Sequence, residues 1–448
     1  MVTYEDMVKA WLQCRKNKRN TAESVKFEMN AMDEIASLTE QINARTYKIG
    51  RSNCFVVTSP RLREVFAANF RDRVPHHYVA MKLEPLFEKH LNEKTFNCRK
   101  GKGQLYGIEC LKRDMFECSK GYTEDCWVMK VDIKGFFMSI DKAIMAKEID
   151  DFILQHYSGN DIEDLRWLCR MFVMHEPQHD CVRKSPMRLW DKLPKHKSLF
   201  TCPKGKGLPI GNLYTQLFAN WHLTYLDEQI ECDFGDYHGR YVDDIYIMSR
   251  DKQRLLDYVP CIRRMLAEKG LKLNERKFYI QHYTKGVEFT GAIVKPCRTY
   301  TRHKVIDGLR GAVKKMSRIC RAADCDGYHF IEAINSAADS INSYLGIAAK
   351  HNDFEKAEHI VLQLEKPFYR FGQVCERGRR SRGSPIRVRL KRRFTLQGWT
   401  DEQIREIIKH KKKQIWQNTL SKTRTVMSSR RRARATRKRS TMGTLWLS

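Results

Sequence analysis

The 448-residue sequence lacks the apolar runs that mark membrane and secreted proteins. It has no run of about 18 or more apolar residues, so no transmembrane helix is predicted. The opening residues, MVTYEDMVKAWLQCRKNKRN, have no apolar core of the kind that a signal peptide carries. We therefore expect a cytoplasmic protein with no membrane partner.

Ordered cysteine spacing is also absent: the fifteen cysteines are odd in number and none are spaced C-x-x-C. A disulfide framework is not indicated, and reduced thiols in the cytosol are the simple interpretation. His175, His179 and Cys181 form an irregular H-x-x-x-H-x-C pattern, which is a candidate zinc site. Most of this pattern lies in a proline- and lysine-rich stretch, 176–206, which is expected to be a surface connection.

Acidic residues are scarce near the C-terminal end. Residues 376–448 hold 23 Lys and Arg against 4 Asp and Glu, a net charge of +19, and the rest of the chain supplies +11 of the total of +30. A polyelectrolyte tail on a moderately basic body favours a polyanionic partner, and nucleic acid over a membrane. A solvated tail without a specific partner is the alternative.

Hydrophobic periodicity predicts helical segments on each side of a mixed middle part. The expected helices cover 76–91, 142–175, 213–230, 252–270, 303–371 and most of 1–50. The expected strands include FVV, LREVFA, WVMKVDI, GRYVDDIYIMSR, LKLNERKFYIQ and KGVEFTGAIVKP. This order predicts an α+β core that carries the chemistry, a helical C-terminal domain and a basic tail with one further helix over 401–413.

Two acidic sites interrupt apolar segments in the middle part. Asp132 lies in the strand VMKVDI, and Asp243 and Asp244 lie where two short strands meet. A carboxylate among buried β-branched residues is costly unless it is paired or bound to a metal. Three such carboxylates can hold two divalent cations about 3.5–4 Å apart, which suits in-line phosphoryl transfer, and oxygen ligands favour Mg²⁺. An ordinary turn at Asp243–Asp244 is the alternative, but the apolar and aromatic flanks argue against it.

KVDIKGFF and YVDD together resemble the carboxylate arrangement of reverse transcriptases. Further pieces similar to that family occur in the expected order: FRDRVPHH, FNCRKGKG, GLPIGN, LKLNERK and GVEFTGAIVKP. The resemblance implies a right-hand polymerase with a helical N-terminal segment (1–50), fingers and palm (51–300), a helical thumb (301–371) and a basic tail (372–448). It also implies two Mg²⁺ ions and the extension of a primer on an RNA template from dNTPs.

The same resemblance implies the metal ligands. Asp132 and Asp243 would be the main ligands and Asp244 would support them. Ile133 is placed with these three among the residues that hold the metal.

Four other residues acquire roles from this resemblance. Lys277 would protonate the leaving pyrophosphate, and Phe137 would be the steric gate that excludes a ribose 2′-hydroxyl. Arg63 and Arg71 match basic finger positions near the incoming triphosphate, where the planar arginine fork suits phosphate. A core aromatic at Phe137 and a surface arginine at Arg63 are the plainer alternatives.

The stretch KGLPIGNLYTQLFAN resembles the diversity-generating retroelement branch of the family. Ile210-Gly211 stands where most of these enzymes have Gln-Gly, and Gln216 stands where they have proline. The resemblance places these three residues at the nucleotide. It implies a bacterial or phage-encoded enzyme that copies a template-repeat RNA into cDNA, with frequent errors at template adenines. A small, basic, oligomeric accessory protein would be its partner.

Ile210 also has a physical interpretation. Glutamine at this position can hydrogen-bond the nucleotide or a nearby strand, whereas isoleucine cannot and its branched side chain is stiff. Rejection works best when a mismatch leaves a polar group unpaired, so Ile210 is a candidate cause of relaxed base selection. A packing role is the alternative. For the whole chain, the alternatives are a group II intron or retron-like enzyme and a catalytically dead RNA-binding scaffold.

Overall fold

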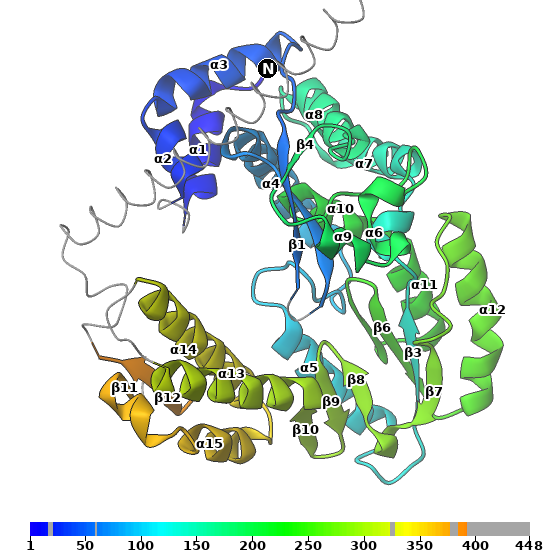
Figure 1. The fold of residues 1–448 in the computed structure, drawn as a ribbon. Helices are drawn as coiled ribbons and strands as arrows, with labels where there is room; N and C mark the ends of the chain where they lie inside the picture. Colours follow the sequence, from blue (N-terminus) through cyan, green and yellow to red (C-terminus); the bar gives the residue numbers. More distant parts are fainter. Residues whose placement is uncertain (17–20, 59–60, 323–327, 377–383, 392–448) are drawn as a thin grey trace, which may run out of the picture. The chain divides into compact units, whose positions relative to one another are not determined.

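A computed structural model describes residues 1–16, 21–58, 61–322, 328–376 and 384–391. The chain divides into two compact units, Met1–Thr299 and Tyr300–Ser448. Helices and strands are mixed in the first unit, as the predicted α+β class requires (Figure 1). Within the described ranges, no helix is both long enough and apolar enough to cross a membrane.

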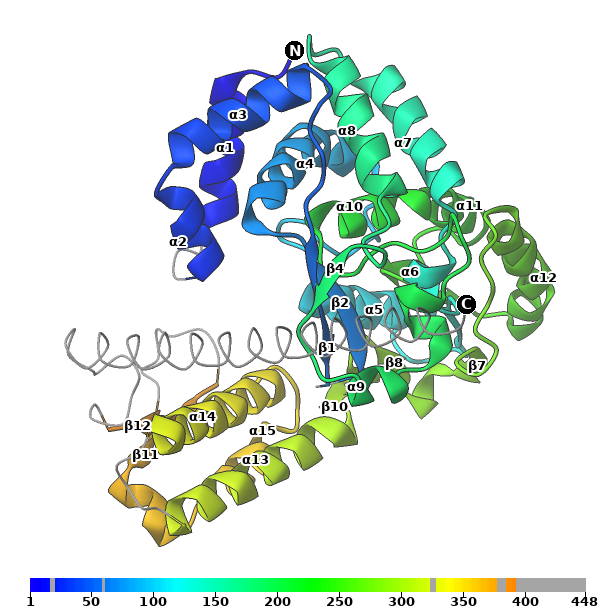
Figure 2. The same cartoon turned by 45° about the horizontal axis from the view of Figure 1, so that its top comes forward.

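The N-terminal segment is helical, as expected, and consists of α1 (Tyr4–Arg15), α2 (Ala22–Glu28) and α3 (Ala31–Asn43). Thr3 begins α1 by accepting a hydrogen bond from the Asp6 N–H, a normal N-cap. Helix α1 packs against α4 (Phe70–His90) (Figure 2). The periodicity predicts the start of this helix at His76, but it begins six residues earlier, because the Asn69 side chain caps it by accepting from the Asp72 N–H.

A three-stranded sheet of order β2–β1–β4 follows. Strands β1 (Ser52–Val57) and β2 (Arg63–Ala67) are antiparallel, and β4 (Cys181–Arg183) adds a parallel strand. The connection 176–206 therefore joins this sheet instead of only crossing the surface. It also contains the short helices α9 (Arg188–Asp191), η1 (Lys195–Lys197) and η2 (Leu199–Thr201).

The central sheet has the order β5–β6–β3–β7 and is antiparallel throughout. Its strands are β3 (Trp127–Asp132), β5 (His238–Tyr241), β6 (Asp244–Ser249) and β7 (Tyr279–His282). Met129 and Ile247 point into one hydrophobic cluster, whereas Val128 and Tyr246 point into another. Both faces of the sheet are therefore buried, which explains why β3 and β6 read as almost continuous apolar runs.

Helices cover this sheet on both faces (Figures 1 and 2). Helix α5 (Gln104–Cys118) covers one face, and α11 (Thr224–Phe234) and α12 (Lys252–Glu268) cover the other. The remaining helices of this part are α6 (Phe136–Ser139), α7 (Lys142–His156), α8 (Ile162–Met174) and α10 (Leu213–His222). After the short η3 (Tyr283–Lys285), strands β8 (Val287–Phe289) and β9 (Ala292–Lys295) pair, and β10 (Arg298–Thr301) follows.

The second unit is mostly helical, as expected for 303–371. It contains α13 (His303–Arg321), α14 (Tyr328–Ala348), α15 (Phe354–Leu362), η4 (Lys366–Arg370) and the hairpin of β11 (Gly372–Glu376) and β12 (Ile386–Leu390). Val388 packs into the same core as Ile341, and the Asn342 side chain bonds both the N–H and the carbonyl of Val388. The hairpin is therefore part of this unit, although the tail was expected to begin at 372. The helix predicted over 401–413 lies outside the described residues.

Candidate active site

The central sheet places the predicted carboxylates on neighbouring strands. Asp132 ends β3, Asp244 begins β6, and the register pairs these two residues directly. Because side chains alternate along a strand, Lys130 shares a face with both of them. The backbone of Asn274 also bonds the Asp132 carbonyl, at 2.8 Å, which fixes the end of β3.

Lysine ammonium groups hold two of the three carboxylates. Lys277 Nζ lies 2.5 Å from Asp132 Oδ2, and Asn274 Nδ2 donates to Asp132 Oδ1 at 2.7 Å. Lys130 Nζ forms an ion pair with Asp244. Lys277 thus lies beside the predicted carboxylates, and its side chain is 51% exposed. The sequence did not single out Lys130 or Asn274, although Asn274 stands in the same LNERK stretch as Lys277.

Asp243 lies in the two-residue turn that joins β5 to β6 (Val242–Asp243). Val242 has a φ of 60°, a strained conformation for a β-branched residue. Burial, and then the negative charge of Asp132, raise the pKa of the Asp243 carboxyl to about 6. The carboxylate at the end of β3 thus lies close enough for its charge to act on the carboxylate in the turn.

A buried ion pair supports this turn. Arg240 and Asp227 are 0% and 1% exposed, and they share hydrogen bonds of 2.6–2.9 Å. Nη1 of the arginine donates to the Val242 carbonyl (3.2 Å), and Nη2, which also bonds Asp227, donates to the Asn220 carbonyl (3.0 Å). One guanidinium therefore ties the strained turn to helices α10 and α11.

The donor set of the three aspartates fits a hard divalent cation, because all the side-chain ligands are carboxylate oxygens. Ile133 can contribute only its backbone carbonyl oxygen. Among the described residues, no three His, Cys, Asp or Glu side chains are grouped so that they could hold a metal ion, and lysines pair with Asp132 and Asp244. The same holds for His175, His179 and Cys181, so the candidate zinc site is not formed.

Ile210 and Gly211 form a turn against strand β2. The Ile210 carbonyl accepts the Phe66 N–H at 2.8 Å, and the Asn212 side chain accepts the Ala68 N–H at 3.2 Å. Gly211 has a φ of 123°, and a Cβ there would lie 2.7 Å from Val65 Cγ1. The close approach therefore requires glycine at this position.

Phe137 lies beside this turn, because its carbonyl accepts the Leu208 N–H at 2.8 Å. Phe137 and Ile210 are both half-buried and pack against the small cluster of Cys54, Phe66, Met138 and Leu199. The structure thus brings the predicted steric gate and Ile210 together.

The other predicted nucleotide-binding residues, Gln216, Arg63 and Arg71, each contact a different part of the chain. Gln216 is exposed on α10 and accepts from Cys98 Sγ at 2.6 Å. Arg63 is exposed at the start of β2, and its charge acts on Tyr241 of the YVDD segment. Arg71 instead donates to Glu34 (3.0 Å) and Gln41 (3.1 Å) of α3.

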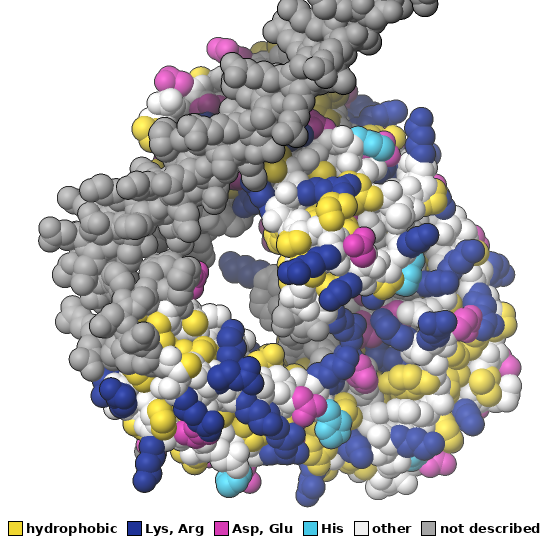
Figure 3. Space-filling view, in the orientation of Figure 1, with side chains coloured by type: hydrophobic (Ala, Val, Ile, Leu, Met, Phe, Trp, Pro, Cys, Tyr) yellow, Lys and Arg dark blue, Asp and Glu magenta, His cyan; other side chains and the backbone are white. Residues whose placement is uncertain are grey.

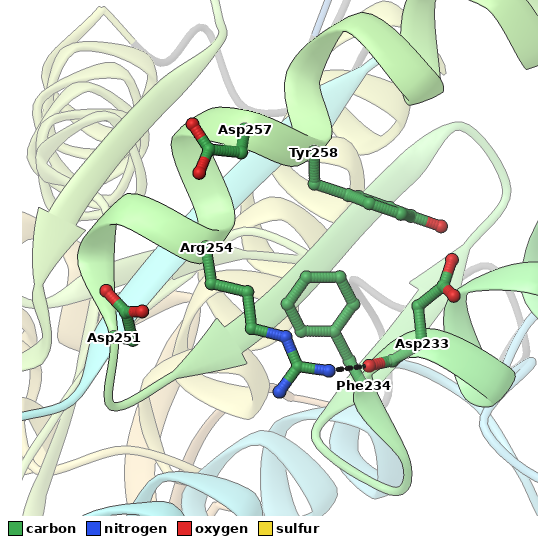
Figure 4. A pocket seen from close by; sticks show the side chains of 6 residues that line it. All are labelled: Asp233, Phe234, Asp251, Arg254, Asp257 and Tyr258. Atoms are coloured by element: carbon green, nitrogen blue, oxygen red, sulfur yellow. Dashed lines mark hydrogen bonds between the residues drawn. The ribbon is translucent and has the colours of Figure 1, made fainter.

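Lys and Arg side chains spread over the visible face of the described parts, with Asp and Glu between them (Figure 3). An open hollow of about 380 Å³ lies between the end of α11 and the start of α12 (Figure 4). None of its lining residues is a predicted site residue: Asp233, Phe234, Asp251, Arg254, Asp257 and Tyr258.

The profile of the family described as reverse transcriptase (RNA-dependent DNA polymerase) matches residues 58–294, just over half of the chain. No curated protein sequence matches.

Solved structures of telomerase are similar to this chain. Apo telomerase from Candida tropicalis is 10% identical, with a TM-score of 0.41, over 72% of this chain and 62% of that chain. Telomerase from Candida albicans, in complex with a TWJ fragment of telomeric RNA, is 10% identical, with a TM-score of 0.39, over 71% and 56%. The chain thus spans less than two thirds of the length of these telomerases.

Proposed function

The chain belongs to the reverse transcriptase family, the RNA-dependent DNA polymerases, and from that premise we propose that it copies a template-repeat RNA into cDNA with errors directed to adenine. The observation that supports polymerisation best is the pairing of Asp132 with Asp244 in register, with Asp243 in the adjoining turn. Carboxylates that neighbouring strands bring together are what a two-metal phosphoryl-transfer site needs.

The carboxylates would hold the metal, with Asp132 and Asp243 as main ligands, Asp244 in support and the Ile133 carbonyl as a further oxygen. Bound Mg²⁺ would supply charge neutralisation at the triphosphate and activation of the primer hydroxyl. Lys277, beside Asp132, would donate a proton to the departing pyrophosphate.

Nucleotide selection is proposed for the turn next to β2. Phe137 would exclude the 2′-hydroxyl, and Gly211 would allow close approach of the backbone. Arg63 and Arg71 would contact phosphate, for which Arg71 must exchange its bonds to α3. Gln216 would contact the nucleotide from the exposed face of α10.

Relaxed fidelity is assigned to Ile210. Its carbonyl is occupied by Phe66 and its side chain packs on apolar neighbours, so it offers the base no polar contact. A mispaired base then leaves no protein group unpaired at this position, and the penalty for misincorporation is small.

Sequencing the cDNA made from a defined RNA template by the wild type and by Ile210→Gln tests this assignment. We expect wild-type substitutions to concentrate opposite template adenine, and the variant to make several-fold fewer of them, with other positions little changed. An equal error rate opposite adenine in both proteins would show that Ile210 does not relax selection.

The proposed partners are the template-repeat RNA and its cDNA, dNTPs, and a small, basic, oligomeric accessory protein. The similarity of GLPIGN and its flanks to the diversity-generating branch supports them. The same similarity favours this branch over group II intron or retron-like enzymes.

A further inference from the structure

A cavity of about 100 Å³ lies where α4 meets the start of α10. Its lining residues are Arg73, His76, His77, Gly211, Asn212 and Leu213, and none of these six is acidic. The volume corresponds to about three water molecules of liquid, enough for one tetrahedral oxyanion. Gly211 places the cavity directly at the turn that packs on β2.

Arg73 gives this cavity a positive charge. Its Nε donates to the Ala68 carbonyl at 2.8 Å, and no carboxylate in the described part of the chain pairs with it. Four of the five guanidinium N–H groups therefore remain for another acceptor. A half-buried guanidinium without an acidic partner is costly, so this arrangement points to an anionic ligand.

His76 is the second observation, independent of Arg73. It is 2% exposed, its Nδ1 has no hydrogen-bond partner, and its ring is held edge-on by Phe172 (4.5 Å) and Tyr214 (4.8 Å). Burial, with the charges of His77, His175 and Arg73, lowers the pKa of the imidazole to about 3, so it is neutral at pH 7. A neutral imidazole fixed in the wall still carries one N–H donor.

The start of α10 adds further donors. The Asn212 side chain accepts from Ala68 and does not cap this ten-residue helix. The N–H groups of its first turn thus carry the partial positive charge of a helix N-terminus without a side-chain cap. Such an end favours phosphate.

We propose that this cavity binds one phosphate group of the nucleic-acid substrate, held by Arg73, His76 and the first turn of α10. The inference rests on the proposed function, because it takes its ligand from the polymerase substrates. The phosphate comes from the RNA–DNA hybrid or from the incoming triphosphate. A contact to the hybrid backbone beside Gly211 would fix the register of the strand without reading its sequence.

The test measures the affinity of an RNA–DNA hybrid for wild type, Arg73→Gln and a matched control, Arg166→Gln. Arg166 carries the same charge but is paired with Asp150 and Glu163 on helices α7 and α8. We expect Arg73→Gln to weaken binding of the hybrid about tenfold, against less than about twofold for the control. The slope of log affinity against log salt concentration should become smaller by the amount that corresponds to roughly one phosphate contact. With one methylphosphonate placed at successive positions of the hybrid, wild type should lose affinity at one position where Arg73→Gln loses none.

If the ligand is instead the triphosphate, the KM for dNTPs rises in Arg73→Gln while hybrid affinity stays constant. His76→Phe, which keeps the ring packing, should act like Arg73→Gln: it should weaken hybrid binding or raise the KM for dNTPs, whichever Arg73→Gln does. Thermal melting checks that the variant is folded. The proposal is overturned if neither quantity differs between Arg73→Gln and Arg166→Gln. Failure of the proposed function is distinguishable, because it appears as a wild type that binds hybrid but makes no DNA.

Discussion

The charges of single residues explain much of this site. The charge of Asp132 raises the pKa of the Asp243 carboxyl, and the charges of Lys277 and Lys130, which pair with Asp132 and Asp244, offset part of this rise. The sequence predicted the three aspartates because carboxylates among apolar strand residues need a partner. The sequence did not predict which lysines pair with these aspartates, because Lys130 is adjacent to Asp244 only through the pairing of two strands that are distant in the sequence. Arg71 shows the same limit: its bonds to α3 depend on how two helices pack.

His76 makes a prediction about pH at the residue scale. Its pKa is about 3 in the folded chain, below the ordinary value of 6.5, so only the unfolded chain takes up a proton between these values. The contribution of His76 to the free energy of unfolding is therefore complete above pH 6.5. It is lost as the pH falls toward 3, because protonation then favours the unfolded chain. Between pH 7 and pH 5 the loss is about 2 kcal/mol.

The measurement is the thermal unfolding midpoint at pH 7 and pH 5 for wild type and His76→Phe. The variant should lose less stability on acidification, although His175, whose pKa burial lowers to about 4, acts in the same direction in both proteins. Equal losses in the two proteins would contradict the account of His76.

At the scale of elements, buried polar anchors position the site. Glu64 of β2 is 1% exposed and accepts hydrogen bonds from Trp190, Ser198 and Leu199, which ties the 176–206 connection to β2. Most helices, and the strands β1 to β3 and β5 to β9, follow from the hydrophobic pattern of the sequence. The strands β4, β10, β11 and β12 do not. In β4, three residues carry too little pattern, and their pairing with β1 is decided by tertiary contacts.

The Arg240–Asp227 pair makes a prediction at this scale. Arg240→Lys keeps the charge next to Asp227 but loses the fork that also bonds the Val242 and Asn220 carbonyls. A misplaced Asp243 should lower kcat about ten- to hundredfold, with a change in the KM for dNTPs of less than about threefold. Steady-state primer extension separates the two constants. Reduced thermal stability with an unchanged kcat would mean that the pair supports only the fold.

At the scale of the whole molecule, charge is divided unevenly along the chain. Composition alone predicted a polyanionic partner, and membership of the reverse transcriptase family agrees with that expectation. The place where the tail begins could not be predicted from composition. Arg387 and Arg389 look like tail residues, yet they alternate with core residues Ile386, Val388 and Leu390 in β12.

A truncation that tests the tail should therefore end at Lys391, after the hairpin. It removes 16 basic and 3 acidic residues. We expect weaker binding of the template RNA, and a log–log salt slope that is smaller by about 0.7 for each phosphate that the tail neutralises. Titrations at several salt concentrations measure both. An unchanged affinity and slope would show that residues 392–448 do not bind the RNA.

The central claim is that the paired carboxylates catalyse RNA-templated DNA synthesis. Its most direct test is extension of a DNA primer on an RNA template with dNTPs and Mg²⁺, by wild type, Asp243→Ala and the exposed control Asp257→Ala. We predict Mg²⁺-dependent extension by wild type and by the control, and a loss of about a thousandfold or more in Asp243→Ala with RNA binding retained. No Mg²⁺-dependent synthesis by the wild type, or equal synthesis by Asp243→Ala, would contradict the account.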